Sequence, residues 1–312
     1  MMAFVTYCCA LLAALVLAPL LPGIINRVKA KVAGRQGKPL LQLYYDLAKL
    51  LRKGAVISTT TSWVFAAGPV LSLVTALTAL LLLPLGGVAS PLAFQGDFLL
   101  AAYVMGLGRF FVILAALDTG SAFEGMGASR EATYSALAEP VSFLCFLCLA
   151  GLGAAEALHL PLSLSSMFAG APALAWTDSR PEVFLLPLVI FLLLLVENCR
   201  IPIDDPNTHL ELTMIHEVMI LDHSGPDLAF IHYAAALKLW FFSALLAGIL
   251  VPSVCVNPLA QAGVNLLAIL AVAVVVGMTE SLMARVRLFR ISHLLGGAGM
   301  LAALSLILTL MR

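Results

Sequence analysis

The stretch PLVIFLLLLVENCRIPIDDPNTHLELTMIHE, residues 187–217, joins two kinds of sequence that rarely adjoin in a soluble protein. Its first ten residues are apolar, and six charged residues and two histidines follow from Glu197 onward. Such a junction is typical of a membrane-spanning helix that ends in a polar loop, because lipid solvates the apolar part and water the charged part. The stretch therefore predicts an integral membrane protein with a polar site against the end of a span.

The composition of the whole chain supports this prediction. Of its 312 residues, 62% are hydrophobic and 11% are charged, and the mean hydropathy is +1.05. Soluble domains carry about a quarter charged residues, so a soluble fold of this size is excluded. A transmembrane β-barrel is excluded as well, since the apolar runs are continuous rather than alternating.

Apolar runs predict an all-α, polytopic membrane protein with about eight transmembrane helices in one integral membrane domain, residues 1–312. A span needs about 20 apolar residues. Runs that approach or exceed this length lie at residues 3–25, 66–88, 98–117, 135–158, 183–197, 230–251, 263–284 and 293–311. The fifth run is short. The first has no basic residue before it and is predicted to be a retained span rather than a cleaved signal.

Basic residues are distributed unevenly among the loops. Residues 26–65 carry eight Lys/Arg and one acid, and residues 285–292 carry three arginines. The loops in alternate positions contain one base between them, Arg180. The positive-inside rule therefore predicts both termini on the outer side of the cytoplasmic (inner) membrane. The loops predicted on the cytoplasmic side are 26–65, 118–134, 198–229 and 285–292.

The first of these loops contains an amphipathic stretch. Apolar residues recur with helical spacing between Leu40 and Leu51, and polar residues lie opposite them. The pattern predicts a helix that lies on the lipid headgroups, one that docks under a partner subunit, or both. The candidate partner-docking residues are Lys49, Arg52, Lys53, Arg130 and Glu131.

A short helix is predicted in the 198–229 loop. Asp205 and Pro206 form a typical helix start, and the Ser-Gly-Pro run at 224–226 is a typical stop. The helix is expected over roughly 206–221. Three histidines recur every seven residues, and we interpret them as interfacial rather than metal-binding, because no cysteine is near and the spacing is wide. They are His209, His216 and His223.

No cofactor or metal motif is evident in the chain. Cys145 and Cys148 form a CxxC pair, but it lies inside an apolar run and has no second pair. Packing is the favoured interpretation of these thiols. We therefore expect no cofactor, metal or catalytic residue in this chain.

Ionisable side chains within the apolar runs are candidates for function, because charges are costly in lipid. For the bases Arg109 and Lys238, pairing with a carboxylate that holds helices together is the alternative. The acids recur on several helices, which predicts a wet polar seam where carboxylates near bases take up and release protons. The candidates for this proton path are Arg109, Asp118, Glu139, Glu197, Arg200, Asp204, Asp205, Glu217, Lys238 and Glu280.

The loop after the fifth run also resembles a known family. The pattern Glu-x-x-Arg-x-Pro-x-Asp-x-Pro at 197–206, followed by Glu211-Leu212, is similar to the signature loop of the NADH dehydrogenase subunit 1 family. That family comprises eight-helix membrane subunits of complex I. The stretches GRQGKPLLQLYYDLAKLLRKG, LDTGSAFEGMGASREATYSALAEP and ESLMARVRLFR resemble the branch found in membrane-bound nickel–iron hydrogenases of the formate hydrogenlyase and hydrogenase-4 type.

The resemblance implies roles for particular residues. Glu139, Glu197, Asp204 and Glu211 match acids that line the family's cavity and proton entry path, and Arg200 matches the arginine that stabilises the loop carboxylates. Asn207 and His209 occupy positions that complex I relatives usually fill with acids, and the first loop lacks their Arg-x-Gly-Pro-Asn run. These departures favour the hydrogenase branch over a quinone site.

The function expected from this resemblance is that of a membrane subunit in a multisubunit group 4-type nickel–iron hydrogenase. Such a subunit anchors the hydrophilic redox arm and couples its electron transfer to proton or sodium movement. The implied partners are a nickel–iron large subunit, an iron–sulfur small subunit and antiporter-like membrane subunits, with the lipid bilayer around them and no nucleic acid. The alternatives are a quinone-site subunit of a complex I-type dehydrogenase, a stand-alone proton-coupled transporter and a passive membrane anchor.

Overall fold

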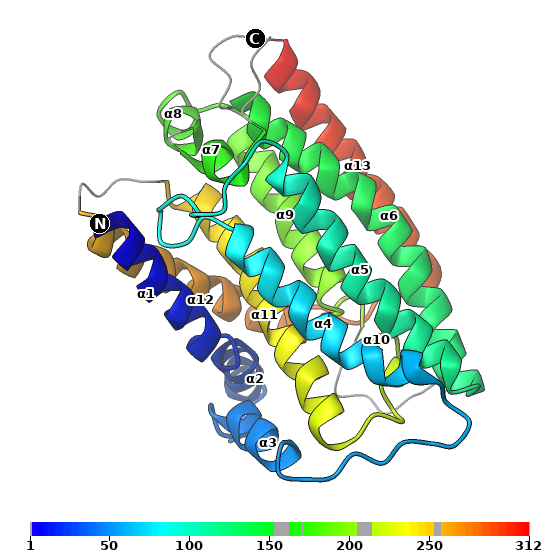
Figure 1. The fold of residues 1–312 in the computed structure, drawn as a ribbon. Helices are drawn as coiled ribbons and strands as arrows, with labels where there is room; N and C mark the ends of the chain where they lie inside the picture. The colour runs from blue at the N-terminus through cyan, green and yellow to red at the C-terminus, as the bar shows by residue number, and fades with distance from the viewer. Residues whose placement is uncertain (1, 153–161, 170, 205–213, 253–256, 312) are drawn as a thin grey trace.

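The computed structural model describes residues 2–152, 162–169, 171–204, 214–252 and 257–311 (Figure 1). Within these ranges the regular secondary structure is helical, apart from an isolated β-bridge between Leu85 and Val88. The prediction of an all-α protein is confirmed. Buried apolar side chains from Tyr7 to Ala302 form one large cluster that joins most of the helices.

In the described part of the chain, six helices are individually long and apolar enough to cross a membrane. A seventh span results if two helices that meet at an angle of 52° are counted as one, namely α1 (Met2–Leu17) and α2 (Leu20–Val32). The six are α4 (Trp63–Leu82), α5 (Asp97–Asp118), α6 (Ala122–Leu152), α11 (Gly225–Leu250), α12 (Pro258–Leu282) and α13 (Leu288–Leu310). The prediction of a multi-pass membrane protein is confirmed.

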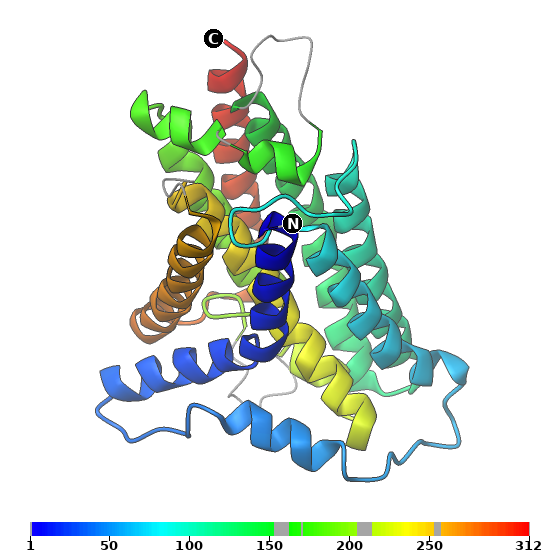
Figure 2. The same ribbon diagram turned by 60° about the vertical axis from the view of Figure 1, so that its left-hand side comes forward.

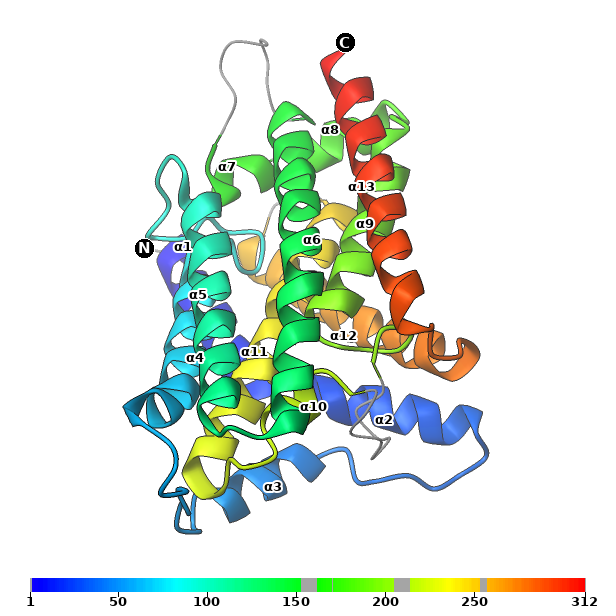
Figure 3. The same ribbon diagram turned by 90° about the vertical axis from the view of Figure 1, so that its right-hand side faces the viewer.

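The remaining predicted span is the short helix α9 (Glu182–Glu197), which lies inside the bundle (Figure 3). Its 16 residues extend over about 24 Å at 1.5 Å per residue, less than a bilayer core of about 30 Å. Eleven of them are buried, because α6, α11 and α13 pack around the helix. A helix that packs against protein over most of its surface has less need to match the thickness of the lipid, which is consistent with its length.

Two predicted spans have different boundaries in the structure. Helix α6 begins at Ala122 rather than near residue 135, so Arg130 and Glu131 lie on a helix and not in a loop. Hydropathy detected only the most apolar part of this helix. The first span, predicted at 3–25, breaks at Ala18-Pro19, and α2 continues to Val32 (Figure 2). Proline has no N–H group to bond to the preceding turn, which permits this bend.

The amphipathic helix predicted at 40–51 is present as α3 (Gln42–Leu50) and lies beneath the bundle (Figure 2). It contacts α2 and α11. Leu43 is half-buried and packs against the main apolar cluster, and the Tyr44 hydroxyl donates a hydrogen bond to the Val16 carbonyl. Lys49, Arg52 and Lys53 are exposed.

The short helix predicted in the 198–229 loop is present, but it is shorter than the predicted range of 206–221 over the described residues. Only α10 (His216–Met219) is helical there, and residues 205–213 lie outside the described residues, so Asp205, His209 and Glu211 cannot be placed. The Ser-Gly-Pro run at 224–226 does not end a helix but begins α11, where proline fits because the first turn needs no N–H. The short helices α7 (Leu164–Phe168) and α8 (Ala171–Thr177) lie at the opposite end of the bundle (Figure 1).

Candidate functional site

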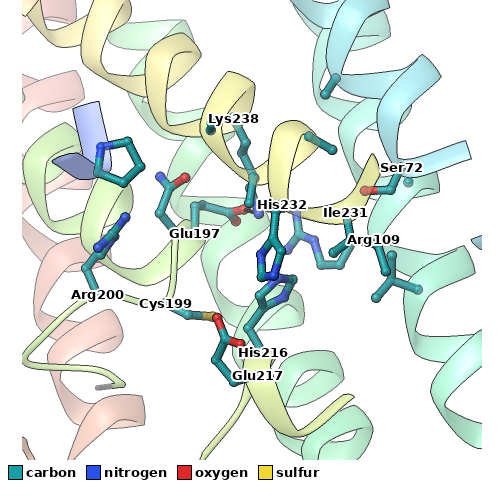
Figure 4. A pocket seen from close by; sticks show the side chains of 18 of the residues that line it. Ser72, Arg109, Glu197, Cys199, Arg200, His216, Glu217, Ile231, His232 and Lys238 are labelled. Atoms are coloured by element: carbon teal, nitrogen blue, oxygen red, sulfur yellow. Dashed lines mark ion pairs between the residues drawn. The ribbon is translucent and has the colours of Figure 1, made fainter. Parts of the chain in front are cut away.

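A cavity of about 310 Å³ lies between α4, α5, α9 and α11 and extends to residues of α3 and α10. Figure 4 shows some of its lining side chains. Residues of α2, α3, α4, α5, α6, α9, α10 and α11 line it. Its titratable lining residues are Lys38, Arg109, Glu131, Glu197, Cys199, Arg200, Asp204, His216, Glu217, His232 and Lys238. A polar cavity of this size can hold several water molecules.

Glu197, the last residue of α9, lies at the centre of an ion-paired group (Figure 4). Its Oε2 is 2.9 Å from Lys238 Nζ on α11 and 3.2 Å from Arg109 Nη2 on α5. The carboxylate is 3% exposed, so both ion pairs are shielded from bulk water. One carboxylate thus holds two bases from separate helices.

Two further ion-paired carboxylates fix the loop that follows α9. Glu280 on α12 lies 2.8 Å from Lys29 on α2 and 3.6 Å from Arg200 in the loop. Asp204 pairs with Arg285 at 2.9 Å and accepts a hydrogen bond of 2.7 Å from the backbone N–H of Ile215. The loop is therefore held at both ends by buried acids, so its charged residues keep fixed positions at the cavity.

A smaller pocket of about 40 Å³ continues from the cavity toward the middle of the bundle. It is lined by Glu139 on α6, whose carboxylate is half-buried. The pocket and the cavity share Arg109 and Glu197, so this ion pair lies on the boundary between them. Arg109 also lies within electrostatic reach of Glu131 and Glu139.

Two histidines face the cavity near Arg109 (Figure 4). The Nε2 atom of His216 is shielded from solvent and has no hydrogen-bond partner among the described residues. Burial lowers the pKa of His216 to about 3, and the positive charge of Lys238 adds to this effect. His216 is therefore neutral at pH 7. His232 approaches from α11.

The structure brings together most, but not all, of the residues predicted for the proton path. Six line the cavity, and Glu139 lines the adjoining pocket. Glu280 does not line the cavity but forms an ion pair with Arg200, which does. Asp118 lies elsewhere, where its carboxylate accepts hydrogen bonds from Ser62 at the start of α4. The six are Arg109, Glu197, Arg200, Asp204, Glu217 and Lys238.

The residues predicted for partner docking are divided between surface and interior. The three basic residues at the end of α3 are exposed, as described above. Glu131 is 9% exposed and faces the cavity, where its Oε2 lies 3.6 Å from the Cys199 thiol. Arg130 donates a hydrogen bond to the Met214 carbonyl and so holds the chain that leads into α10.

Several residues of the site were not found from the sequence. Lys29 and Arg285 were assigned to the basic loops, although each pairs with a buried acid. The sequence around His232 contains no motif that marks this residue as part of the site. Outside the cavity, Glu182 was missed as well; it lies one residue before the predicted fifth run and is 1% exposed. An apolar run shows where a span lies but not which flanking side chains turn inward.

The arrangement places ionised carboxylates beside bases at a cavity, which is a chemistry suited to proton transfer. Among the described residues, no group of three or more His, Cys, Asp or Glu side chains could hold a metal ion. Cys145 and Cys148 are buried on α6, and the Cys148 sulfur lies 3.0 Å from the Ser305 hydroxyl. Carboxylates held beside bases and water are the groups that exchange protons near neutral pH.

Comparisons with known proteins agree with the fold and the resemblance of the signature loop. The model of the NADH dehydrogenase family matches residues 5–311. Hydrogenase-4 component C of Escherichia coli K12 is 31% identical over 297 residues, which cover 93% of this chain and 91% of that protein. Formate hydrogenlyase subunit 4 of the same organism is 30% identical over 277 residues, 87% of each chain.

The fold is shared with a chain in a solved membrane complex. A chain in the structure of the membrane-bound sulfane sulfur reductase, an archaeal respiratory membrane complex, superposes with a TM-score of 0.82 at 18% identity. The match covers 99% of this chain and all of that one. Together, the family match over residues 5–311 and two relatives at about 30% identity show that this chain belongs to the NADH dehydrogenase family.

Proposed function

We propose that this protein is the membrane subunit of a multisubunit group 4-type nickel–iron hydrogenase, similar to formate hydrogenlyase, that couples electron transfer to proton movement. The two Escherichia coli relatives support the hydrogenase branch. The observation that carries the coupling role is the position of Glu197. It is paired with two bases on the boundary between the open cavity and the pocket at Glu139.

In the proposed mechanism, protons enter the cavity from the side of α3 and reach Glu197 through the lining acids. Arg109 and Lys238 stabilise the charged form of Glu197. A shift of either base away from the carboxylate would favour its protonation, because a buried carboxylate without a nearby positive charge prefers the neutral form. The proton can then pass into the pocket at Glu139. A partner subunit that moves the loop at 198–204 would couple its redox state to this step.

The partners follow from the same assignment. We propose that the redox arm, which consists of a nickel–iron large subunit and an iron–sulfur small subunit, docks on the face that carries α3. The exposed Lys49, Arg52 and Lys53 lie there. The nickel–iron centre and the clusters would belong to those subunits, and antiporter-like subunits would pack against the lipid-facing helices. Charge reversal of the three bases should weaken docking, measured by co-purification in rising salt.

A quinone-site subunit of a complex I-type dehydrogenase is a second candidate. It is favoured by the size of the cavity and by apolar residues at its edge, such as Pro22 and Leu43, where an amphipathic ligand could enter. A photoreactive quinone analogue that labels the cavity, with turnover that requires quinone, would replace the first proposal by this one. Both candidates place the metals in partner subunits, so the chain purified alone should contain no stoichiometric iron or nickel.

The coupling role is tested by removing the ability of single acids to titrate. Glu139→Gln and Glu197→Gln keep the shape of the side chain but cannot bind and release a proton. We expect the complex with Glu139→Gln to assemble, as judged by native gel, and to move several-fold fewer protons per turnover in sealed vesicles. Asp118→Asn is the matched control, since Asp118 lies outside the cavity.

The outcomes separate a proton relay from a structural role. Undiminished proton movement in both Gln variants would refute the relay. The Glu139 carboxylate has no ion pair in the described part of the chain, so we do not expect its neutralisation to prevent assembly. Loss of assembly in Glu139→Gln would therefore show a structural role for this acid. An equal loss in Asp118→Asn would show that the effect does not depend on the cavity.

A further inference from the structure

Helix α9 begins and ends with a buried glutamate. Glu182 is 1% exposed and Glu197 is 6% exposed, and the 14 residues between them are apolar. Glu197 is the acid of the charged cavity. Glu182 lies at the other end of the helix, about 22 Å away for 15 residues at 1.5 Å each. No part of the proposed cavity mechanism uses it.

In the part of the chain that the structure describes, Glu182 forms no ion pair. Its Oε2 atom is buried and has no hydrogen-bond partner among the described residues. The Cys148 thiol on α6 lies within its electrostatic reach. The Cys148 sulfur is in turn 3.0 Å from the Ser305 hydroxyl and 3.4 Å from the Thr309 hydroxyl, both on α13. The helices α6, α9 and α13 pack against one another, and Cys148 and its two hydroxyl partners lie on α6 and α13.

A second acid at the same end of the bundle shows what a structural carboxylate looks like. Asp97 is completely buried and accepts hydrogen bonds from the backbone N–H groups of Phe94 and Leu164 and from the Ser163 hydroxyl. These donors stabilise its charge and join two loops. The described residues offer no such donor to the Oε2 atom of Glu182, so the structure does not account for this side chain as a clamp.

The position of Glu182 in the first turn of α9 does not explain its burial either. The partial positive charge of a helix N-terminus contributes only about 0.3–1 kcal/mol to a nearby carboxylate, and up to about 2 kcal/mol in favourable buried geometry. Burying a charged carboxylate without a partner costs several kcal/mol. The neutral, protonated form removes this cost. The burial of Glu182 is therefore not explained by the contacts of the described residues.

We propose that Glu182 is a second proton-binding site, which receives protons that have passed the Glu197 cavity and releases them at the opposite end of the bundle. This inference rests on the proposed coupling function. In its proton-loaded state Glu182 is a neutral carboxylic acid; on release, the proton passes to water and the carboxylate remains. Because the two glutamates are too far apart for direct transfer, carriers must lie between them. The Ser243 hydroxyl is a candidate, since it is buried without a partner five residues beyond Lys238 on α11.

Labelling with a hydrophobic carbodiimide tests proton binding without relying on turnover. This reagent modifies protonated carboxyl groups in apolar surroundings and can be located by mass spectrometry of the assembled complex in its membrane. We expect Glu182 to be labelled, the labelling to fall as the pH is raised, and sodium ions at constant pH to leave it unchanged. Asp178 is the internal comparison, because it is exposed, pairs with Arg180 and lies four residues away.

Three results would overturn the proposal. Glu182 could remain unlabelled at every pH, or be labelled no more than Asp178. Protection by sodium ions would replace the proton site by a sodium site.

Proton movement in sealed vesicles is a second measurement. The complex with Glu182→Gln should assemble and move several-fold fewer protons per turnover, whereas Glu182→Asp, which keeps a carboxyl group, should restore a substantial part of this movement. Asp178→Asn should have no effect, and equal movement in Glu182→Gln and the unmodified complex would count against the release role.

The failure of this inference can be told apart from the failure of the proposed function. If Glu139→Gln impairs coupling and Glu182→Gln does not, the cavity relay stands and the second site is wrong. If Glu182 is labelled as expected but the unmodified complex moves no protons, the proton-binding site stands and coupling fails.

Discussion

At the scale of single residues, the unequal sharing of charge around Glu197 has a consequence for stability. One carboxylate neutralises two bases, Arg109 and Lys238, from different helices. Removing its charge leaves both bases buried without their main partner. Removing one base leaves the carboxylate with the other. The three side chains are therefore not equivalent, although each contributes to the same group.

We predict that Glu197→Gln destabilises the protein more than Lys238→Met does. Breaking a buried ion pair by removing one partner typically costs about 3–5 kcal/mol, because the remaining charge is uncompensated. Lys238→Met should cost less, since Arg109 still pairs with Glu197. Thermal unfolding midpoints of the detergent-purified proteins measure this order. A midpoint for Lys238→Met at or below that of Glu197→Gln would contradict the shared-carboxylate arrangement.

His223 predicts a dependence of stability on pH. Its ring is 3% exposed, stacks on Phe65 with the centroids 4.0 Å apart, and has no hydrogen-bond partner for either nitrogen in the described part of the chain. Burial lowers the pKa of His223 to about 4, from an ordinary value of 6.5. As the pH falls from about 6.5 to about 4, the unfolded chain binds a proton at this site and the folded chain does not. The free energy of unfolding therefore decreases, by up to about 1.4 kcal/mol per pH unit.

The measurement compares unfolding midpoints at about pH 7 and about pH 5 in the unmodified protein and in His223→Leu. Other titrating groups, His216 among them, remain in both proteins, so the difference isolates His223. We expect the variant to lose less stability on acidification. An identical loss in both proteins would show that His223 is not shielded as described.

The candidate site illustrates how far single residues can be predicted from sequence. Arg109, Glu197 and Lys238 could be found because a charge inside an apolar run stands out. Asp118 met the same criterion, but its carboxylate contacts Ser62 at the start of α4 instead of the cavity. Hydropathy could not reveal this, because it gives no information on the direction in which a side chain points. Lys29 and Arg285 lie in basic loops, where their inward-facing partners Glu280 and Asp204 cannot be recognised without the fold.

At the scale of secondary-structure elements, the approach of α6 to α10 sets the shape of the cavity. Gly127 on α6 faces α10, and a Cβ atom there would lie 2.9 Å from the Ile215 carbonyl oxygen and still closer to Val218. Because α10 carries His216 and Glu217 at the cavity, a displacement of this short helix would move two lining residues. On the same helix, Gly125 has open space where its Cβ would be.

We predict opposite effects for two alanine substitutions on this helix. Gly127→Ala should destabilise the protein by about 1–3 kcal/mol through overpacking against α10, and should also reduce coupling. Gly125→Ala should leave the protein unchanged or stabilise it by up to about 1 kcal/mol, since alanine favours helix more than glycine does. Unfolding midpoints and proton movement in vesicles measure both. Equal behaviour of the two variants would contradict the close contact between α6 and α10.

The elements themselves were predictable to different degrees. The spans at 98–117 and 183–197 correspond closely to α5 and α9, because polar residues border both runs. The start of α6 was missed because residues 122–134 are polar enough to read as a loop, although a helix can extend beyond the lipid. The loop helix was predicted from a capping signal at Asp205 and Pro206, which lie outside the described residues, and it is present as the four residues of α10.

At the scale of the whole molecule, the charged groups are separated along the bundle. The cavity, α3 and the basic turn before α13 lie at one end, and α7, α8 and the loop at 83–96 lie at the other (Figures 1 and 3). Basic residues are abundant at the first end, whereas among the described residues Arg180 is the base that lies near the second. Since positively charged loops remain in the cytoplasm, we propose that the cavity opens to the cytoplasm and that both termini lie outside.

This orientation is tested by the access of a thiol reagent that does not cross membranes. Single cysteines are introduced in a variant without native cysteines, one at Lys53→Cys and one at Asp178→Cys, because both side chains are exposed and lie at opposite ends. We expect Lys53→Cys to be labelled only in inside-out vesicles and Asp178→Cys only in right-side-out vesicles. Detergent should make both reactive, which controls for burial. The reverse pattern would place the cavity on the outer side, where it could not take protons from the cytoplasm, and would overturn both the direction of transfer and the docking face proposed for the redox arm.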